Sequence, residues 1–150
     1  MMIQKLNHTH VDIARKIRSV FQVSYAVEAD LLKAIDFPPL KRSLANFLKS
    51  KTDFYGYFQD NELAAVTEIK TENNNTHIQS LVVDPYYFRQ GIGKSLISFV
   101  LRTYKTTTFS VETGLDNLPA KALYTKCGFI ETKQWNTEHG LRKVRFKKQI

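Results

Sequence analysis

The sequence predicts an α/β domain built on a mixed, mostly antiparallel sheet that is flanked by helices. Three observations predict this class. Short aromatic or β-branched segments follow one another between residues 53 and 83, a strand-like run at 80–83 leads through a glycine turn into an amphipathic helix, and two more strand-like segments close the sequence. With 150 residues, 43% of them hydrophobic, the chain has the size of one domain, which we expect to span residues 1–150.

The first third of the chain predicts helices. Thr9 and Asp12 resemble a capping box, and apolar residues at helical spacing follow, so we expect a helix from about residue 9 to 21. A short helix around Leu31 is expected to stop at Pro38-Pro39, and another helix should follow them. Together these segments predict a helical hairpin over about residues 9–50 with an irregular, aromatic and acidic middle.

The hydrophobic period changes at residue 53. The segments DFYGYFQ, ELAAVTEIK and HIQSLVV are separated by Asp60-Asn61 and by ENNN, which favour hairpin turns. Because a parallel return needs a longer connection, three strands joined in this way predict an antiparallel meander. The helix after the glycine turn and the strand TTTFSVET then predict one parallel crossover.

The last third predicts one more helix and a closing hairpin. Asn117 is expected to cap a helix with Ala120, Leu123 and Tyr124 on one face, and Gly128 stands where helices commonly end in the left-handed conformation. FIETKQW and LRKVRF should complete the sheet as a hairpin.

Charge and composition narrow the function without naming a partner. The net charge of +8 and the pI of about 9.6 favour an anionic partner. The basic residues near the end alternate with apolar ones, as in a half-buried strand, so we expect no nucleic-acid partner. No apolar run approaches the roughly 20 residues of a membrane span, and no signal peptide is recognisable, so a cytoplasmic protein without a membrane partner is expected. Cys127, the only cysteine, is interpreted as a small core side chain, and no metal is expected.

The glycine turn in LVVDPYYFRQGIGKSL is typical of phosphate binding. A Walker A loop needs a glycine where Phe88 stands, so that motif matches only at Gly93-Lys94-Ser95. A dinucleotide fingerprint would need its third glycine at Leu96. A strand followed by Gly-x-Gly at a helix start remains, in which backbone amides hold a pyrophosphate such as that of coenzyme A.

Two motifs resemble those of the GNAT superfamily of acyl-CoA-dependent N-acyltransferases, over about residues 53–146. LVVDPYYFRQGIGKSL is similar to the family's pyrophosphate loop, and NLPAKALYTKCGFIE matches its spacing of Asn, Ala, Tyr and Gly-Phe. The resemblance implies a GNAT-type sheet in which the two parallel strands splay apart and admit acetyl-CoA. Phe88 departs from the family's usual Gln or Arg, which concerns one side-chain contact and leaves the backbone amides in place.

The resemblance also assigns cofactor residues. Backbone groups of Leu81, Val82 and Val83 would pair with the pantetheine arm, and an amide near Val82 or Val83 would hold the thioester oxygen. Asn117 and Tyr124 of the second motif would also contact the cofactor. The residues expected to hold the pyrophosphate are Arg89, Gln90, Gly91, Ile92, Gly93 and Lys94.

Acetyl transfer to an amine asks for an acid and a base. Tyr124 matches the family's general acid, although its spacing alone would also suit a packed aromatic residue. His77 occupies the register of the base in the histone-modifying branch, and Glu68 and Glu112 on neighbouring strands are rivals.

The acceptor is expected to meet the helical hairpin. Tyr25, Glu28 and Asp30 in this segment would suit a cationic amine, whereas solvated helix ends explain the two acids equally well. These observations favour an N-acetyltransferase that transfers acetyl directly to a small-molecule, peptide or protein amine, as a monomer or homodimer. The alternative is a domain that binds coenzyme A as a sensor or regulatory partner.

Overall fold

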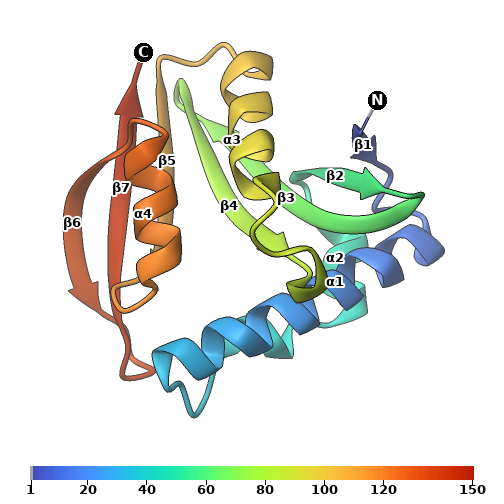
Figure 1. The fold of residues 1–150 in the computed structure, drawn as a ribbon, viewed down its shortest axis with the longest axis horizontal. Helices are drawn as coiled ribbons and strands as arrows, with labels where there is room; N and C mark the ends of the chain where they lie inside the picture. The colour runs from blue at the N-terminus through green and yellow to red at the C-terminus, as the bar shows by residue number, and fades with distance from the viewer. Residues whose placement is uncertain (1) are drawn as a thin grey trace.

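The computed structural model describes residues 2–150, which form one seven-stranded sheet with helices on both faces (Figure 1). The elements in chain order are β1 (Ile3–Leu6), α1 (Val11–Leu32), the 3₁₀ helix η1 (Pro38–Lys41), α2 (Leu44–Lys49), β2 (Asp53–Gln59), β3 (Glu62–Glu72), β4 (Asn75–Val83), the 3₁₀ helix η2 (Pro85–Tyr87), α3 (Ile92–Thr103), β5 (Thr108–Gly114), α4 (Leu118–Lys126), β6 (Ile130–Asn136) and β7 (Arg142–Gln149).

The strand order is β1-β2-β3-β4-β5-β7-β6, and every neighbouring pair is antiparallel except β4 and β5. The predicted meander is therefore confirmed as β2, β3 and β4, with left-handed residues at both turns, Asp60-Asn61 and Asn73-Asn74. The parallel crossover β4–α3–β5 and the hairpin of β6 and β7 are confirmed too. This is the mixed α/β sheet that the sequence predicted.

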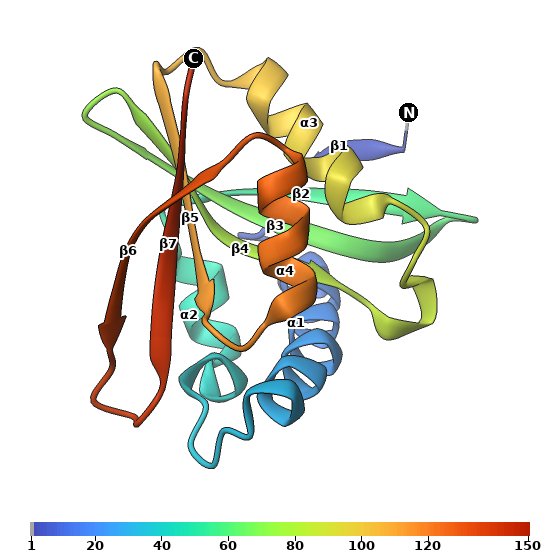
Figure 2. The same ribbon diagram turned by 60° about the vertical axis from the view of Figure 1, so that its left-hand side comes forward.

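Two apolar cores lie on opposite faces of the sheet. On one face, α1 and α2 cover the meander through residues such as Phe21, Phe47 and Phe54. On the other face, α3 and α4 pack on the sheet through residues such as Ile97 and Tyr124 (Figure 2). The sheet therefore lies between α1 on one face and α4 on the other.

The helical hairpin differs from its prediction. One helix, α1, runs unbroken from Val11 to Leu32, where a helix ending near residue 21 and a separate short helix were expected. The cap is His10 and makes no side-chain hydrogen bond, so the expected capping box at Thr9 is wrong. No proline or glycine interrupts residues 11–32, and the buried Ala29 and Leu32 extend the apolar face, so the helix continues to a left-handed residue at Lys33. The short edge strand β1 was not predicted.

The second motif folds as expected. The Asn117 side chain caps α4 by accepting a hydrogen bond from the Ala120 amide at 3.3 Å, and Gly128 after the helix has a φ of 90°. Cys127 is half-buried and packs at the edge of the α3–α4 core. Within residues 2–150, none of the helices is both long and apolar enough to cross a membrane.

Candidate active site

The two parallel strands separate at a β-bulge. β4 and β5 pair only from Asn75 to Ile78, opposite residues 108–111. In the β3–β4 ladder, Glu68 faces Ser80 whereas the next residue, Ile69, faces Ile78, so Gln79 is an extra residue on β4. A bulge bends the strand that carries it, and β4 leaves β5 directly after this one. The bulge therefore opens the sheet between residues 79–83 and 112–114.

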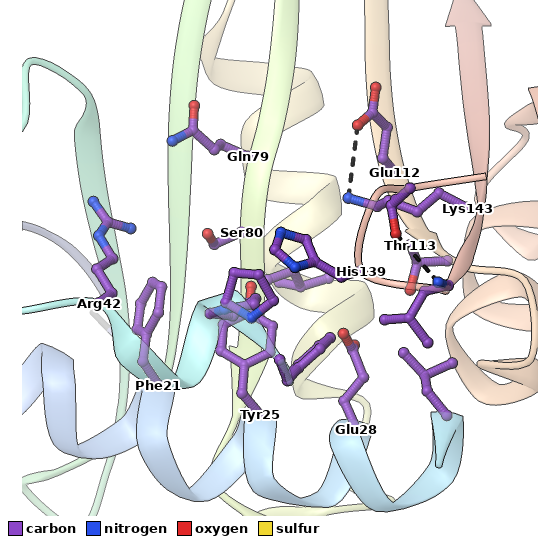
Figure 3. A pocket seen from close by; sticks show the side chains of 18 of the residues that line it. Phe21, Tyr25, Glu28, Arg42, Gln79, Ser80, Glu112, Thr113, His139 and Lys143 are labelled. Atoms are coloured by element: carbon purple, nitrogen blue, oxygen red, sulfur yellow. Dashed lines mark hydrogen bonds and ion pairs between the residues drawn. The ribbon is translucent and has the colours of Figure 1, made fainter. Parts of the chain in front are cut away.

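A cavity of about 770 Å³ lies at this opening. Its walls come from α1, the connection between α1 and α2, the diverging ends of β4 and β5, α4 and the β6–β7 loop (Figure 3). Among the polar and ionisable lining residues are Tyr25, Glu28, Asp36, Arg42, Gln79, Ser80, Glu112, Thr113, Tyr124, His139 and Lys143. Segments that are far apart in the sequence thus meet around one cavity.

The cleft side of β4 presents backbone amides. The Asp84 amide bonds to the Ala64 carbonyl of β3 at 2.9 Å, and in an antiparallel ladder alternate residues point to the same neighbour. The amides of Leu81 and Val83 therefore point away from β3, toward the cleft, while that of Val82 points to β3. Val83 already donates to the Ser24 hydroxyl of α1 at 3.2 Å. This leaves Leu81 as the donor that faces the cleft, where an amide near Val82 or Val83 was expected.

The glycine loop stands on the α3 side of the sheet. Gly91 caps α3 with a left-handed φ of 73°, and no side chain bonds to the first amides of this 12-residue helix. Arg89, Gln90 and Lys94 are exposed around it, whereas Ile92 is buried under the loop. A Cβ added to Gly93 would lie 3.1 Å from Leu123 and 4.0 Å from Leu81. The loop therefore borders α4 and the cavity-lining Leu81, and its free amides suit a pyrophosphate. Phe88 is exposed beside it.

Tyr124 lies on the inner wall of the cavity and is 5% exposed. Burial raises the pKa of Tyr124 above its ordinary value, and the nearby charges of Glu28 and Tyr25 raise it further. The phenol therefore keeps its proton at neutral pH. The ring also packs against Phe129 and Phe146, as a packed aromatic residue would, and the general-acid role stays a prediction.

Glu28 projects from α1 into the cavity beside Tyr25, also a lining residue (Figure 3). Its carboxylate accepts a hydrogen bond of 2.8 Å from the side-chain amide of Asn117, the residue that caps α4. Burial raises the pKa of Glu28, against the lowering effects of Lys143 and Asn117. The structure therefore joins an expected substrate residue to an expected cofactor residue. Asp30 is exposed and does not line the cavity.

The candidate bases lie in different surroundings. Glu112 lines the cavity, and its carboxylate lies 3.4 Å from Arg145 and 3.9 Å from Lys143. His77 lies where β4 and β5 still pair, outside the cavity lining, with its ring Nδ1 2.7 Å from the Ser110 hydroxyl. Burial lowers the pKa of His77.

Glu68 is fully buried behind the cavity wall. Its carboxylate accepts hydrogen bonds from both Arg42 Nη1 and Nη2, at 2.7 and 3.0 Å, and from the hydroxyls of Thr52 and Ser80, at 2.8 and 3.0 Å. Burial by itself raises the pKa of Glu68, but the hydrogen bonds and charge of Arg42, together with the hydroxyls of Thr52 and Ser80, outweigh it and hold the pKa below its ordinary value. Glu68 is thus an ionised anchor with its acceptor capacity used.

Sequence reasoning missed Ser24, Arg42, Lys143 and His139. Arg42 and His139 stand in the two loops at the cavity mouth, where His139 Nδ1 lies 3.5 Å from Asp36. These residues carry no local signal, because their roles depend on contacts between distant segments. Among residues 2–150 no group of three or more His, Cys, Asp or Glu side chains is arranged to hold a metal ion.

A mixed sheet that splits between its two parallel strands, with a glycine loop on one side and a cavity lined by acidic and basic side chains on the other, fits the class of acyl-CoA-dependent acyltransferases. The chain belongs to the acetyltransferase (GNAT) domain family, whose model matches residues 27–150.

Two curated relatives are similar to the chain, and one of them is named as an acetyltransferase. Streptothricin acetyltransferase of Escherichia coli is 30% identical over 119 residues, which cover 75% of this chain and 68% of the relative. The UPF0157 protein YqkA of Bacillus subtilis (strain 168) is 31% identical over 141 residues, which cover 93% of this chain. The chain spans only 41% of the length of YqkA.

Solved structures share the fold. The ribosomal-protein-S18-alanine N-acetyltransferase of Escherichia coli superposes with a TM-score of 0.75 at 21% identity, covering 99% of this chain and 92% of that one. A putative streptothricin acetyltransferase of Bacillus anthracis str. Ames, in complex with acetyl coenzyme A, gives a TM-score of 0.62 at 22% identity and covers 68% of this chain and 64% of that one.

Proposed function

We propose that the protein is an N-acetyltransferase that transfers an acetyl group from acetyl-CoA directly to a primary amine in a ternary complex. The observation that supports this best is the split between β4 and β5, because it joins the glycine loop, through Leu81, to a cavity that holds Tyr124, Glu28 and Glu112. Acetyl-CoA supplies the acetyl group as an activated thioester. The amides of residues 89–94 would hold its pyrophosphate, with Arg89 and Lys94 nearby, and the cleft side of β4 would hold its arm.

Four groups share the proton transfers and the stabilisation of charge. The Leu81 amide points into the cleft and donates to the acetyl oxygen as that atom gains negative charge. Glu28, whose raised pKa brings it closer to neutral pH, takes the proton of the incoming ammonium directly or through a water. Tyr124 would give its proton to the sulfur as the carbon–sulfur bond breaks and would regain one from the nitrogen, which loses its second proton as the amide forms. Glu112 would hold the cationic acceptor against the cavity wall.

The base assignment rests on differences among the four acids and bases. Glu68 is committed to Arg42, and His77 lies outside the cavity lining. Glu112 is held in ion pairs with Arg145 at 3.4 Å and with Lys143 at 3.9 Å. Glu112 remains the rival of Glu28.

The test begins with ligand binding. Coenzyme A, at 100 times its Kd, should stabilise the folded protein by about 2.7 kcal/mol, whereas ATP with magnesium and NAD should not. A panel of amines is then tested as acceptors, and acetyl transfer to each is monitored through the free thiol of coenzyme A that it releases. No thermal shift with coenzyme A would contradict the cofactor assignment. Binding without any transfer would favour the sensor or regulatory domain.

Tyr124→Phe tests the chemistry, because the ring still fills its place and only the hydroxyl is lost. Single-turnover acetyl transfer should slow by about 10²-fold, with coenzyme A affinity within about twofold of the wild type. Tyr57→Phe, on β2 away from the cavity, is the matched control. An unchanged chemical rate in Tyr124→Phe would remove this phenol from the mechanism.

A further inference from the structure

One face of the strands β5, β7 and β6 carries a row of basic side chains. Along β7, Val144 and Phe146 are buried in the core on the α4 side, so Lys143, Arg145 and Lys147 project from the opposite face. On that face α1 and α2 pack against the meander. The basic face therefore lies beside the α1–α2 layer rather than beneath it.

The neighbouring strand β6 extends the basic face. Lys133 lies opposite Arg145, and Trp135 lies opposite Lys143. The Lys133 ammonium is 5.1 Å from the centre of the Trp135 ring. We call Lys133, Lys143, Arg145 and Lys147 the basic ladder.

The basic ladder is only partly neutralised. Glu112 pairs with Arg145 and Lys143, but among the ion pairs of residues 2–150 none involves Lys133 or Lys147. Residues 130–150 hold six Lys or Arg and two Glu, a surplus of four positive charges, which is half of the net charge of +8. Four of the six, Lys133, Lys143, Arg145 and Lys147, stand on the basic face, whereas Arg142 and Lys148 project on the α4 side of β7.

The ladder begins at the acceptor end of the cavity. Lys143 and Glu112 line the cavity and also stand on the basic face, and His139 and Leu141 of the β6–β7 loop line its mouth. Alternate residues of a strand lie about 6.8 Å apart, so Lys143 and Lys147 span about 13 Å. An extended peptide presents its own alternate side chains at the same spacing.

We propose that the basic ladder docks an acidic, extended segment of a protein acceptor whose amine enters the cavity. The entry of the amine rests on the proposed function, whereas the docking of the segment depends on the face alone. Charge complementarity selects an acidic peptide over a nucleic acid, because a peptide can place its amine and uncharged residues beside the carboxylates of Glu112 and Glu28 at the cavity end of the ladder, whereas a nucleic acid carries a phosphate at every nucleotide. A platform for single-stranded nucleic acid also uses several aromatic side chains that stack on the bases, whereas Trp135 is the one aromatic residue that we place on this face.

The experiment measures peptide binding by fluorescence anisotropy in the presence of coenzyme A. The probe is a peptide with a free N-terminal amine, four small residues, then Glu at three alternate positions and a C-terminal dye. A matched peptide carries Gln in place of Glu. The Glu peptide should bind about tenfold more tightly at low salt, and the difference should shrink in 0.5 M salt, where charges are screened within about 4 Å.

The variant Lys133→Glu/Lys147→Glu should lose at least about fivefold of the affinity for the Glu peptide. Both side chains are exposed and outside the cavity lining, so acetylation of a small amine should be unchanged. Lys16→Glu/Lys51→Glu, which changes the net charge equally at exposed positions of α1 and the α2–β2 loop, is the control and should bind like the wild type.

Retained binding in Lys133→Glu/Lys147→Glu, or an equal loss in the control, would overturn the proposal. An oligothymidylate that binds more tightly than the Glu peptide, and does so through Lys133 and Lys147, would also overturn it in favour of a nucleic acid. If the wild type acetylates no amine, the proposed function fails, and the anisotropy still decides whether the basic ladder docks the peptide.

Discussion

Replacing Arg42 with alanine should destabilise the fold by about 3–5 kcal/mol, the usual cost of leaving a buried charge without its partner. Glu68 is 0% exposed, and Arg42 reaches it with two hydrogen bonds of 2.7 and 3.0 Å. The guanidinium also lies over the Phe47 ring, 4.1 Å from its centre, which adds about 0.5–1 kcal/mol. This one side chain therefore ties the connection between α1 and α2, a wall of the cavity, to β3.

A double-mutant cycle separates the buried charge from the other losses. In Arg42→Ala/Glu68→Gln no charge stays buried, so the double variant should be more stable than Arg42→Ala alone. The coupling between the two changes should be about 2 kcal/mol, within the range seen for residues in one network. Arg15→Ala, at an exposed position of α1 with a 3.9 Å ion pair, should change the free energy of unfolding by less than about 0.5 kcal/mol.

Acidity gives an independent check. Burial raises the pKa of Glu68, but the hydrogen bonds and charge of Arg42 outweigh it and lower the pKa in the wild type. The pair therefore stabilises the fold above the ordinary carboxyl pKa and loses this effect as the pH falls through the lowered value. In Arg42→Ala only the hydroxyls of Thr52 and Ser80 still oppose the effect of burial, so the pKa of Glu68 should rise. The stability gap between variant and wild type should narrow from pH 7 to about pH 5.

Urea unfolding, monitored by far-UV circular dichroism at pH 7 and pH 5, measures the loss in Arg42→Ala, the coupling in the double-mutant cycle and the change of the stability gap with pH. A loss below about 1 kcal/mol in Arg42→Ala would mean that water reaches Glu68. Equal losses in Arg42→Ala and the double variant would mean that the buried charge is not the source of the cost. Either result would refute the reasoning that Arg42 exists to neutralise Glu68.

Three further predictions concern the site. Gly91→Ala should cost about 1 kcal/mol, because its φ is 73°, and should weaken coenzyme A binding in a thermal-shift titration; unchanged affinity would place the pyrophosphate elsewhere. Glu28→Gln should lower kcat/KM about 10²-fold and remove the acidic limb from the pH profile of kcat/KM. In the wild type this limb should lie above the ordinary carboxyl range, because burial raises the pKa of Glu28. A limb that disappears only in Glu112→Gln would make Glu112 the base. His77→Ala should leave single-turnover transfer within about twofold, and a larger loss would return His77 to the mechanism.

The strands and both motifs were predictable because their signals are local. Residues with left-handed backbones such as Asn61 and Asn74 mark the hairpin turns, and Asn117 and Gly128 mark the two ends of α4. Each of these signals depends on a few neighbouring residues. The length of α1 was not predictable in the same way, since Val23, Ser24 and Tyr25 have modest helix propensity, and Tyr25 packs against the core between α1 and the sheet.

The polar partners in the site depend on long-range contacts. The bond from Asn117 to Glu28 joins residues 89 positions apart, and that from Arg42 to Glu68 joins residues 26 apart. No local pattern identifies such pairs. The sequence therefore named Glu28 and Glu68 as interesting carboxylates but left open which one is neutralised and which one lines the cavity.

The split in the sheet was not predictable from the sequence either, because it depends on one extra residue in β4, Gln79. In HIQSLVV the buried positions Ile78, Ser80 and Val82 alternate without interruption, which is the pattern of a regular strand. Ile78 nevertheless packs in the α3–α4 core and Val82 in the α1–α2 core, so β4 changes faces at the bulge of Gln79. Because both faces of the sheet are covered there, a strand that switches faces shows the same burial pattern as one that does not. The bulge that opens the cleft, and turns the Leu81 amide toward it, is therefore invisible to periodicity.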